Sequence, residues 1–289
     1  MIAIAMGLNA NLRRVVLGVI LAFTLVFIAT YIAGVVGLID RMFIYFPDKT
    51  VSTSPESLGL VYEEVFFDTD DGYRLHGWYV PGELDVTFLW FHGNAGNIAG
   101  RLANLKLIHD ELQVNVFLFD YRGYGRSQGG PSQKGLYQDA EAALTYLRAR
   151  ENGAQAKITY FGRSLGAAVA VELAIHHRPY GLILESAFPS IPYMSEHNYP
   201  LVPKWLVKVF VRARYDSLGR ISGVDAPMLM LHGDSDDIVP IEAGRTLFDA
   251  AEEPKSFYVI LGAGHNDIPT AGGPDYFKRL RSFVDGLGL

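Results

Sequence analysis

Residues 157–170, KITYFGRSLGAAVA, decide how the rest of the chain is interpreted. The first five residues are mostly β-branched or aromatic, and this composition predicts a short strand. The pentapeptide GRSLG (162–166) follows, and small apolar helix formers continue after it. A strand, a sharp turn and a helix around G-x-S-x-G together predict a nucleophile elbow with Ser164 at its turn.

The two glycines of this pentapeptide give the turn the space that it needs. We expect the turn to hold Ser164 in a strained backbone conformation, and a Cβ at Gly162 or Gly166 would collide with the neighbouring strand or helix. The hydroxyl of Ser164 would then lie at the C-terminal edge of the sheet, above a helix N-terminus that favours developing negative charge. Because such pentapeptides also occur in loops without a catalytic role, the interpretation depends on partners elsewhere in the chain.

The composition excludes several kinds of site. The 289 residues have room for one large α/β domain and an appendage, and the absence of cysteine excludes disulfides, thiolate metal ligands and a cysteine nucleophile. A formal net charge of −6 on a mixed surface argues against nucleic acid as a partner.

We expect neither a metal nor a cofactor. His176 and His177 are more typical of a surface helix end than of a metal site, and the aspartates near residue 70 are typical of a turn, since a calcium loop needs a distant glutamate. The G-x-G within residues 120–127 lacks the helix and the acidic residue that a dinucleotide fingerprint requires at fixed spacing.

An uncharged segment, VVLGVILAFTLVFIATYIAGVVGLI, runs from Val15 to Ile39. As a helix it would cover roughly 37 Å, enough to cross a hydrocarbon core of about 30 Å with some tilt. Arg13 and Arg14 precede it, whereas the charges that follow nearly cancel. The positive-inside rule then places the N-terminus in the cytoplasm and the body on the non-cytoplasmic side of a single-pass anchor. A cleaved signal peptide and a buried core helix are the alternatives.

The segment after this anchor connects it to the body. Phe43, Tyr45 and Phe46 suit a membrane interface or packing on the body, and the two are compatible. A loop rich in serine follows. We expect a cytoplasmic N-terminus at 1–14, a transmembrane helix at 15–39, a juxtamembrane segment and linker at 40–59, and a catalytic domain at 60–289.

From Leu60 onward, segments with strand and helix patterns alternate with short links. Strands are expected at 61–68, 73–81, 86–91, 114–119, 157–161, 181–185, 227–231 and 256–261. The first two form a hairpin around the turn at Asp70-Asp71-Gly72. The alternation predicts a mostly parallel, doubly wound sheet, on which an antiparallel first hairpin is allowed.

Residues 187–225 interrupt the alternation and are rich in proline and aromatic residues. They follow the C-terminal end of a strand, where ligands bind in open α/β sheets. Residues 202–215 have an amphipathic pattern that predicts a helix. We interpret the insertion as a cap over the site, with an ordinary crossover helix as the alternative, and expect Phe188, Tyr193 and Trp205 to contact substrate.

A serine hydroxyl needs a base within hydrogen-bond reach, and the base needs an acid that orients it. His265 lies in the glycine-rich loop 262–267 after the final strand, from which an imidazole can reach Ser164. We therefore expect His265 to be the base and His92 to be structural. The other six histidines lie in the hairpin, in helices, in the cap or at a strand end.

The loop after strand 227–231 offers three aspartates for the acid. Asp234 is close to the strand end and suited to the turn, whereas Asp237 could cap the next helix. Asp236 lies in the middle of the loop, where its carboxylate can reach inward. We expect Asp236 to be the acid, with Asp237 as the alternative. The chain order Ser164, Asp236, His265 is the order Ser…Asp…His.

The reaction also needs an oxyanion hole made of two backbone N–H groups. One is expected from Leu165, directly after the nucleophile, and the other from the loop 91–97 after the strand 86–91. We expect Asn94 to supply the second donor, with Ala95 as the next candidate and a substrate contact. A helix N-terminus capped by Asn97 is compatible with this role.

Taken together, these segments resemble the α/β-hydrolase superfamily, and specifically its membrane-anchored branch of esterases and acyl-protein thioesterases. The matching segments are DGYRLHGWYVP (71–81), WFHGNAGN (90–97), DYRGYGRS (120–127), GRSLGAA (162–168), HGDSDDIVP (232–240) and GAGHND (262–267). They extend over the whole body, and the position matched by Asp236 holds the acid in that family. The resemblance implies an α/β-hydrolase fold with a small helical cap, preceded by one transmembrane helix.

The expected activity is that of a membrane-anchored serine hydrolase. It would cleave carboxylic esters or thioesters with an acyl or lipid-like chain through an acyl-enzyme on Ser164, without a cofactor. The partners would be a small-molecule ester or thioester and the lipid bilayer. The alternatives are a serine peptidase of the prolyl-oligopeptidase type and a catalytically silent membrane scaffold. A peptidase of this type usually carries a propeller domain, which this sequence lacks. All three triad positions are filled, which argues against a catalytically silent scaffold.

Overall fold

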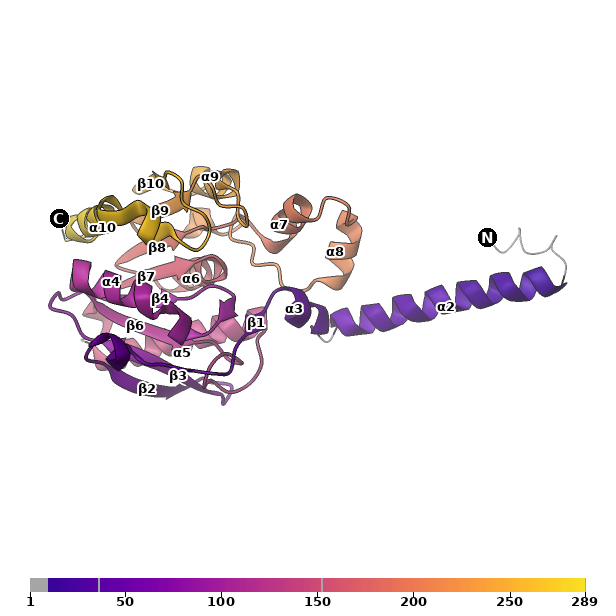
Figure 1. Ribbon diagram of the computed structural model, residues 1–289, viewed down its shortest axis with the longest axis horizontal. Coiled ribbons are helices and arrows are strands. Elements are labelled where there is room, and N and C mark those ends of the chain that lie inside the picture. The colour runs from indigo at the N-terminus through magenta and orange to yellow at the C-terminus, as the bar shows by residue number, and fades with distance from the viewer. Residues whose placement is uncertain (1–9, 36, 152, 289) are drawn as a thin grey trace.

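The computed structural model describes residues 10–35, 37–151 and 153–288. Residues 1–9, which make up most of the expected cytoplasmic segment, lie outside the described residues. Figure 1 shows a layered body from which one long helix, α2, projects.

The body is built on a sheet of eight described strands in the order β10-β9-β8-β7-β4-β6-β3-β2. β3 pairs antiparallel with β2 and with β6, and the other neighbours are parallel. The bounds are β2 Glu63–Asp68, β3 Arg74–Val80, β4 Thr87–Phe91, β6 Asn115–Asp120, β7 Ile158–Arg163, β8 Gly181–Glu185, β9 Met228–Gly233 and β10 Lys255–Ile260. The mostly parallel, doubly wound sheet with an antiparallel hairpin is confirmed.

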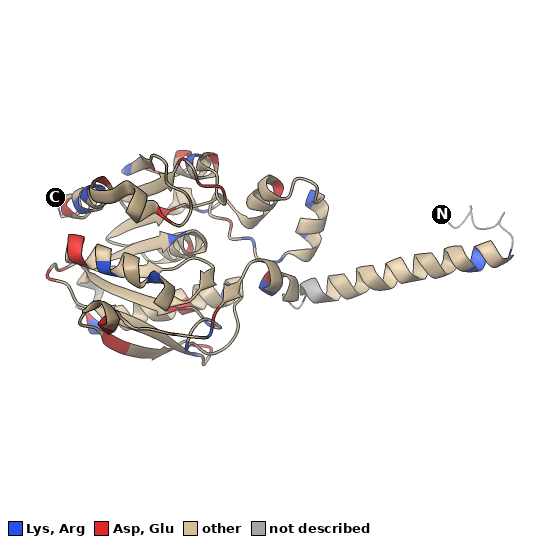
Figure 2. Ribbon diagram, viewed as in Figure 1, with Lys and Arg blue, Asp and Glu red and all other residues tan. Residues whose placement is uncertain are grey.

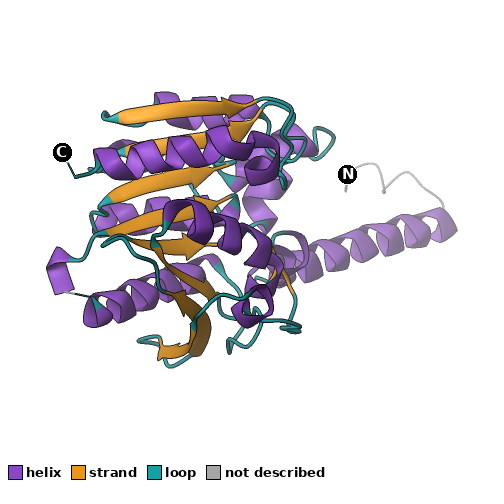
Figure 3. Cartoon of the chain, turned by 60° about the vertical axis from the view of Figure 1, so that its left-hand side comes forward, coloured by secondary structure: helices purple, strands orange, loops and turns teal. Residues whose placement is uncertain are grey.

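Helices cover both faces of the sheet (Figures 1 and 3). α5, α6 and α9 pack with one core cluster, and α4 and α10 with the other. The helices of the body are α4 Leu102–Leu112, α5 Gln133–Arg150, α6 Leu165–His176, α9 Ile241–Asp249 and α10 Ile268–Gly286, with short 3₁₀ turns η1 Pro55–Leu58, η2 Ile98–Arg101, η3 Gly153–Gln155 and η4 Ile221–Gly223. The side chain of Ser132 caps α5 by accepting a hydrogen bond from the N–H of Gly135.

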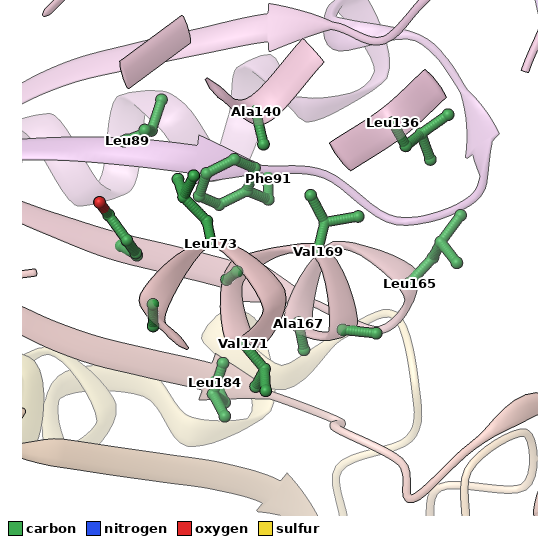
Figure 4. Close-up of a cluster of buried hydrophobic side chains, with 14 of the residues drawn as sticks. Leu89, Phe91, Leu136, Ala140, Leu165, Ala167, Val169, Val171, Leu173 and Leu184 are labelled. Atoms are coloured by element: carbon green, nitrogen blue, oxygen red, sulfur yellow. The ribbon is translucent and has the colours of Figure 1, made fainter. Parts of the chain in front are cut away.

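The centre of the sheet is buried on both faces. All residues of β4 and β7 are buried, which explains why Phe88–Phe91 of β4 is a continuous apolar run and why neither strand alternates between apolar and polar residues. Figure 4 shows α6 with its Val169 and Leu173 directed toward Phe91 of β4. α6 is made largely of small residues, so it lies close against the sheet and fixes the strand-to-helix turn where it begins.

Between β8 and β9 the chain forms the helices α7 Ile191–Asn198 and α8 Lys204–Phe210. The expected helix at 202–215 was too long, because α8 ends at Phe210 and Val211 is extended. The backbone N–H groups of Arg212 and Ala213 bind the buried carboxylate of Asp40 at 3.0 and 2.9 Å. These bonds hold the chain after α8 in a non-helical path, and a local sequence pattern cannot reveal a partner that lies far away in the chain.

The N-terminal helix α2 runs from Ala10 to Val35, and the short helix α3, Leu38–Phe43, follows it. Figure 2 shows α2 as a tan rod with a basic residue only near its N-terminal end. Its apolar stretch Asn11–Ile32 has mean hydropathy 2.7 and no buried residue, so it is a candidate membrane span by length and composition. The alternative of a buried core helix is therefore wrong.

The segment between α3 and the body divides its aromatic residues between two environments. Tyr45 is buried, and its hydroxyl lies 2.8 Å from that of Tyr215. Phe43 and Phe46 are exposed. Strand β1 (Phe46–Pro47) pairs in parallel with β5 (Ala95–Gly96), which directly follows the loop after β4. The juxtamembrane segment therefore lies along the C-terminal edge of the sheet.

Candidate active site

Ser164 lies at the turn between β7 and α6, with φ 53° and ψ −118°. A non-glycine residue in this region of backbone space is strained, and such strain persists only where the surroundings hold it in place. Its N–H donates to the carbonyl of Glu185 in β8 at 2.9 Å, and its carbonyl accepts from Ala167 at 2.9 Å. The side chain of Ser164 is partly exposed at the edge of the sheet.

The two glycines beside this turn have no room for a side chain. A Cβ at Gly166 would lie 2.0 Å from the carbonyl oxygen of Phe91, and one at Gly162 would lie 2.6 Å from the carbonyl oxygen of Gly166. These contacts are with backbone atoms, which cannot rotate away. The close approach of α6 to β4 and β7 therefore requires glycine at both positions.

Asp236 and His265 meet at the same edge of the sheet. His265 Nδ1 lies 2.8 Å from Asp236 Oδ2, and both side chains are buried. The other carboxylate oxygen accepts from the N–H groups of Ile238 and Val239 at 3.0 and 2.8 Å. Burial by itself raises the pKa of Asp236, but the hydrogen bond and charge of His265 with these donors outweigh it, so the pKa lies below its ordinary 3.8.

The other two aspartates of this loop do not contact His265. Asp234 accepts a hydrogen bond from the N–H of Gly262 at 2.6 Å. This bond joins the loop after β9 (234–240), which we call the acid loop, to the loop that carries His265. Asp237 is exposed, and the helix α9 begins after Pro240 rather than at a cap supplied by Asp237. The structure thus brings Asp236, rather than Asp237, to the imidazole.

No hydrogen bond joins Ser164 to His265 in the part of the chain that the structure describes. The two loops are nevertheless adjacent, because the guanidinium of Arg163 donates to the carbonyl of His265 at 2.5 Å. Nucleophile–base contacts are often loose before substrate binds, so this arrangement is compatible with a serine–histidine pair.

Sequence reasoning missed two residues that support this edge. The Ser186 hydroxyl donates to Asp236 Oδ2 at 2.8 Å, and Arg163 holds the loop of His265 as described above. Glu185 lies beside them, and burial raises its pKa although Arg163 and the hydroxyl of Tyr276 oppose this rise. No local sequence signal marks Ser186, because its place between the serine and the aspartate follows from the strand order β7-β8-β9.

The remaining buried histidines near the edge have structural partners. His92 Nδ1 lies 2.7 Å from the carbonyl of Gly93, and burial together with the charge of Arg101 lowers the pKa of His92 to about 3. His232 Nε2 lies 2.8 Å from the carbonyl of Val239, and burial lowers its pKa as well. Both are therefore neutral near pH 7.

The loop after β4 lies against the nucleophile. A Cβ built on Gly93 would be 3.7 Å from the Cβ of Ser164, so this backbone and the serine are neighbours. The carbonyl of Asn94 accepts from Phe46 at 3.2 Å and from the hydroxyl of Tyr124 at 2.7 Å, and its side chain donates to the carbonyl of Ile44 at 2.9 Å. The juxtamembrane segment thus holds the loop in which one oxyanion donor is expected.

The four residues expected to contact substrate lie in different environments. Phe188 is buried in the core, and Tyr193 of α7 is partly buried against it. Trp205 of α8 and Ala95 of β5 are exposed. Among the described residues, no hydrogen bond or ring contact joins Tyr193 or Trp205 to Ser164, Asp236 or His265. Likewise, within residues 10–35, 37–151 and 153–288, no group of three or more acidic or histidine side chains is arranged to hold a metal ion.

Comparison with known proteins identifies the superfamily to which the chain belongs. A model of the family described as serine aminopeptidase S33 matches residues 82–220. The α/β-hydrolase domain-containing protein WAV2 of Arabidopsis thaliana is 35% identical over 280 residues, which cover 88% of this chain and 91% of WAV2. The chain belongs to the α/β-hydrolase superfamily.

Two further likenesses concern the anchor and the fold. A protein of Saccharomyces cerevisiae described as an uncharacterized membrane protein is 32% identical over 241 residues, covering 82% of this chain and 84% of that protein. The structure of an esterase from Pyrococcus furiosus has a TM-score of 0.69 at 21% identity, with 84% of this chain and 98% of the esterase covered. This second likeness shows the α/β-hydrolase fold.

Proposed function

We propose that this protein is a serine hydrolase that cleaves carboxylic esters or thioesters, with Ser164 as nucleophile, His265 as base and Asp236 as the orienting acid. The observation that carries the proposal is the 2.8 Å contact between Asp236 and His265 at the edge where Ser164 occupies a strained turn. A buried carboxylate on Nδ1 fixes the tautomer that leaves Nε2 free to accept a proton.

The proposed reaction proceeds in two halves. Ser164 Oγ attacks the acyl carbon while His265 Nε2 takes the hydroxyl proton, and His265 then gives this proton to the departing alcohol or thiol. Water, activated by the same imidazole, then hydrolyses the ester formed on Ser164. The N–H groups of Leu165 and Asn94 would stabilise the oxyanion in both halves. Leu165 directly follows Ser164 in the chain, and Gly93, which precedes Asn94, lies next to Ser164, which supports this assignment.

The proposed substrates carry an acyl or lipid-like chain, and the proposed location is a membrane. The exposed apolar helix α2 supports a single-pass anchor, and the yeast relative is described as a membrane protein. Arg13 and Arg14 precede the span, which favours a cytoplasmic N-terminus and a body on the opposite side.

The test is turnover of p-nitrophenyl acyl esters by the full-length protein. Ser164→Ala removes the nucleophile, and we expect a loss of about 10⁴-fold or more in kcat. Ser235→Ala is the matched control, since this exposed serine lies in the acid loop and should retain wild-type turnover. Turnover that survives Ser164→Ala unchanged would contradict the proposal.

A peptidase is the second candidate, because the matching family model is described as a serine aminopeptidase. The same three residues could cleave an amide, since the triad chemistry does not depend on the leaving group. Acyl esters of increasing chain length compared with peptide amides, measured on one preparation, separate the two activities. A preference for amides in kcat/KM would favour the peptidase, and the absence of both activities would favour a scaffold.

A further inference from the structure

Helix α8 and the turn before it expose an apolar surface on the side of the body from which α2 projects (Figure 1). We call this surface the apolar cap face: Tyr199, Leu201, Val202, Trp205 and Val209, whose exposed fractions are 63, 95, 42, 57 and 39%. A cluster of this kind next to polar neighbours marks an interaction surface rather than a set of scattered residues.

Helix α8, which carries Trp205 and Val209 of the apolar cap face, packs against the candidate membrane span α2. The ring of Phe210 at the end of α8 contacts that of Phe27 in α2, with centroids 5.6 Å apart. The two helices also enclose an open groove of about 520 Å³, lined by Phe23, Phe27 and Thr30 of α2 and by Leu206 and Phe210 of α8. Its lining is mostly apolar, and the hydroxyls of its two threonines, Thr24 and Thr30, donate to backbone carbonyls of α2, so water is a poor occupant.

The depth of this contact follows from helix geometry. The apolar stretch ends at Ile32, and Phe27 and Phe23 precede that end by about 7 and 14 Å at 1.5 Å per residue. A hydrocarbon core is about 30 Å thick, so a core whose boundary lies at Ile32 holds both residues in the leaflet next to the body. If α2 crosses a bilayer with its boundary there, α8 lies within that leaflet too.

The position of α8 against α2 is held by buried polar contacts. Asp40 of α3 binds the backbone after α8 through two hydrogen bonds, and the hydroxyls of Tyr45 and Tyr215 meet at 2.8 Å. The charged residues of α8, Lys204 and Lys208, are exposed, and long side chains of this kind can extend to the headgroup level while the stem stays in an apolar layer. An apolar face with lysines beside it is typical of a helix at a bilayer interface.

We infer that the apolar cap face is a lipid contact. α8 and the turn before it insert into the leaflet next to the body, and an acyl chain of a bilayer phospholipid occupies the groove between α2 and α8. The inference rests on the anchoring of α2 in the proposed function and deepens it, because a cap that is immersed in lipid presents the catalytic edge to substrates dissolved in the bilayer rather than in water.

The tryptophans provide a direct test. The chain has three, and Trp78 and Trp90 are 1% exposed whereas Trp205 lies on the apolar cap face. The full-length protein is reconstituted into phosphatidylcholine vesicles with and without bromine on the acyl chains, and its fluorescence is compared with that of Trp205→Phe. The fluorescence of Trp205 is the difference between the wild type and this variant, and we expect brominated lipid to quench most of it. The fluorescence of Trp78 and Trp90, which the variant retains, should change little.

Three results would overturn the inference. Quenching of Trp205 by aqueous acrylamide but not by brominated lipid would show that this face lies in water. Protection from both quenchers would show that a second copy or another protein segment covers it. A chain that does not float with the vesicles would overturn both the lipid contact and the anchor.

The absence of cysteine permits a second, independent measurement. A nitroxide on Val209→Cys should be accessible to oxygen dissolved in the bilayer and protected from a water-soluble nickel complex. Val61→Cys is the control, since Val61 is 77% exposed and lies two residues before β2, which is away from α2 in Figure 1. Equal exposure of both labels to the nickel complex would contradict the lipid contact.

Hydrolysis of a water-soluble short-chain ester, measured on the same vesicles, separates this inference from the proposed function. Quenching without hydrolysis would leave the lipid contact standing and reject the hydrolase. Hydrolysis by floating protein without quenching would reject the lipid contact alone.

Discussion

Two regions of the molecule are stabilised in different ways: the sheet edge that carries Ser164, Asp236 and His265, which is the candidate catalytic edge, and the apolar cap face. At the edge, the Asp236 carboxylate receives four hydrogen bonds, and two glycines leave no free space beside Ser164. On the cap face, side chains as exposed as Leu201 have few partners in the protein. The comparison shows that buried hydrogen bonds and close packing within the protein stabilise the edge. The apolar side chains of the cap face have few such partners among the described residues, so burying them requires contact with something outside the protein.

The largest effect is expected from the acid at the edge. Asp236→Asn keeps the shape of the side chain but cannot hold His265 in the tautomer that accepts a proton, and we expect kcat to fall by about 10⁴-fold. Asp237→Asn, one residue away and exposed, should stay within about twofold of wild type. Equal losses in both variants, measured as ester turnover, would remove the distinction between the two aspartates.

The packing of the edge gives the next prediction. Gly166→Ala places a methyl group 2.0 Å from the carbonyl oxygen of Phe91, so we expect a loss of about 3 kcal/mol or more in the free energy of unfolding. Gly100→Ala is the matched control, because a Cβ there has open space within 4 Å. Chemical denaturation gives the unfolding midpoint of each variant. Similar midpoints for Gly166→Ala and Gly100→Ala would show that α6 and β4 have room for a methyl group at position 166.

Ser186 tests the support of the acid. Ser186→Ala removes one hydrogen bond to the Asp236 carboxylate, and such bonds to charged groups contribute about 1.5–3 kcal/mol. We expect kcat to fall roughly 10-fold with KM little changed, because the residue acts through Asp236 rather than on substrate. A change confined to KM would indicate a role in binding instead.

The same carboxylate has a pH dependence with a defined sign. The pKa of Asp236 is lowered in the folded protein, so its contribution to stability is fully present above the ordinary value of 3.8 and is lost as the pH falls below it. The difference in unfolding free energy between wild type and Asp236→Asn should therefore shrink as the pH falls below 3.8. A difference that grows on acidification would mean that the pKa is raised.

The smallest effect is expected from a polar contact near the cap face. Lys204 and Glu196 form an exposed ion pair at 2.5 Å, and exposed pairs contribute about 0–1 kcal/mol. Glu196→Gln should change the unfolding free energy by less than about 0.5 kcal/mol, in contrast to Gly166→Ala. A larger loss would show that polar geometry specifies the cap as well as the edge.

Most of the fold was predictable because its strands are locally encoded. β8 was expected at 181–185 and lies there, since a continuous apolar run between breaks has few other conformations in an α/β chain. The end of α8 was not predictable, because it depends on Asp40, which lies more than 170 residues away in the sequence. Ser186 was missed for the same reason, since its role arises only when β8 lies between β7 and β9.

The cap could be predicted only in part. Its position after β8 followed from the break in alternation, but the pattern could not reveal that Trp205 would be exposed beside α2 rather than buried over the site. Amphipathic patterns identify an apolar face without identifying what covers it. The structure supplies this information through the contact between Phe27 and Phe210.

The most direct test of the account is covalent labelling by a fluorophosphonate, with the modified residue mapped by mass spectrometry. The account predicts one label per chain, located on Ser164, and labelling that is strongly slowed in His265→Ala. A label on another serine, or ester turnover by a protein that takes no label at all, would contradict it.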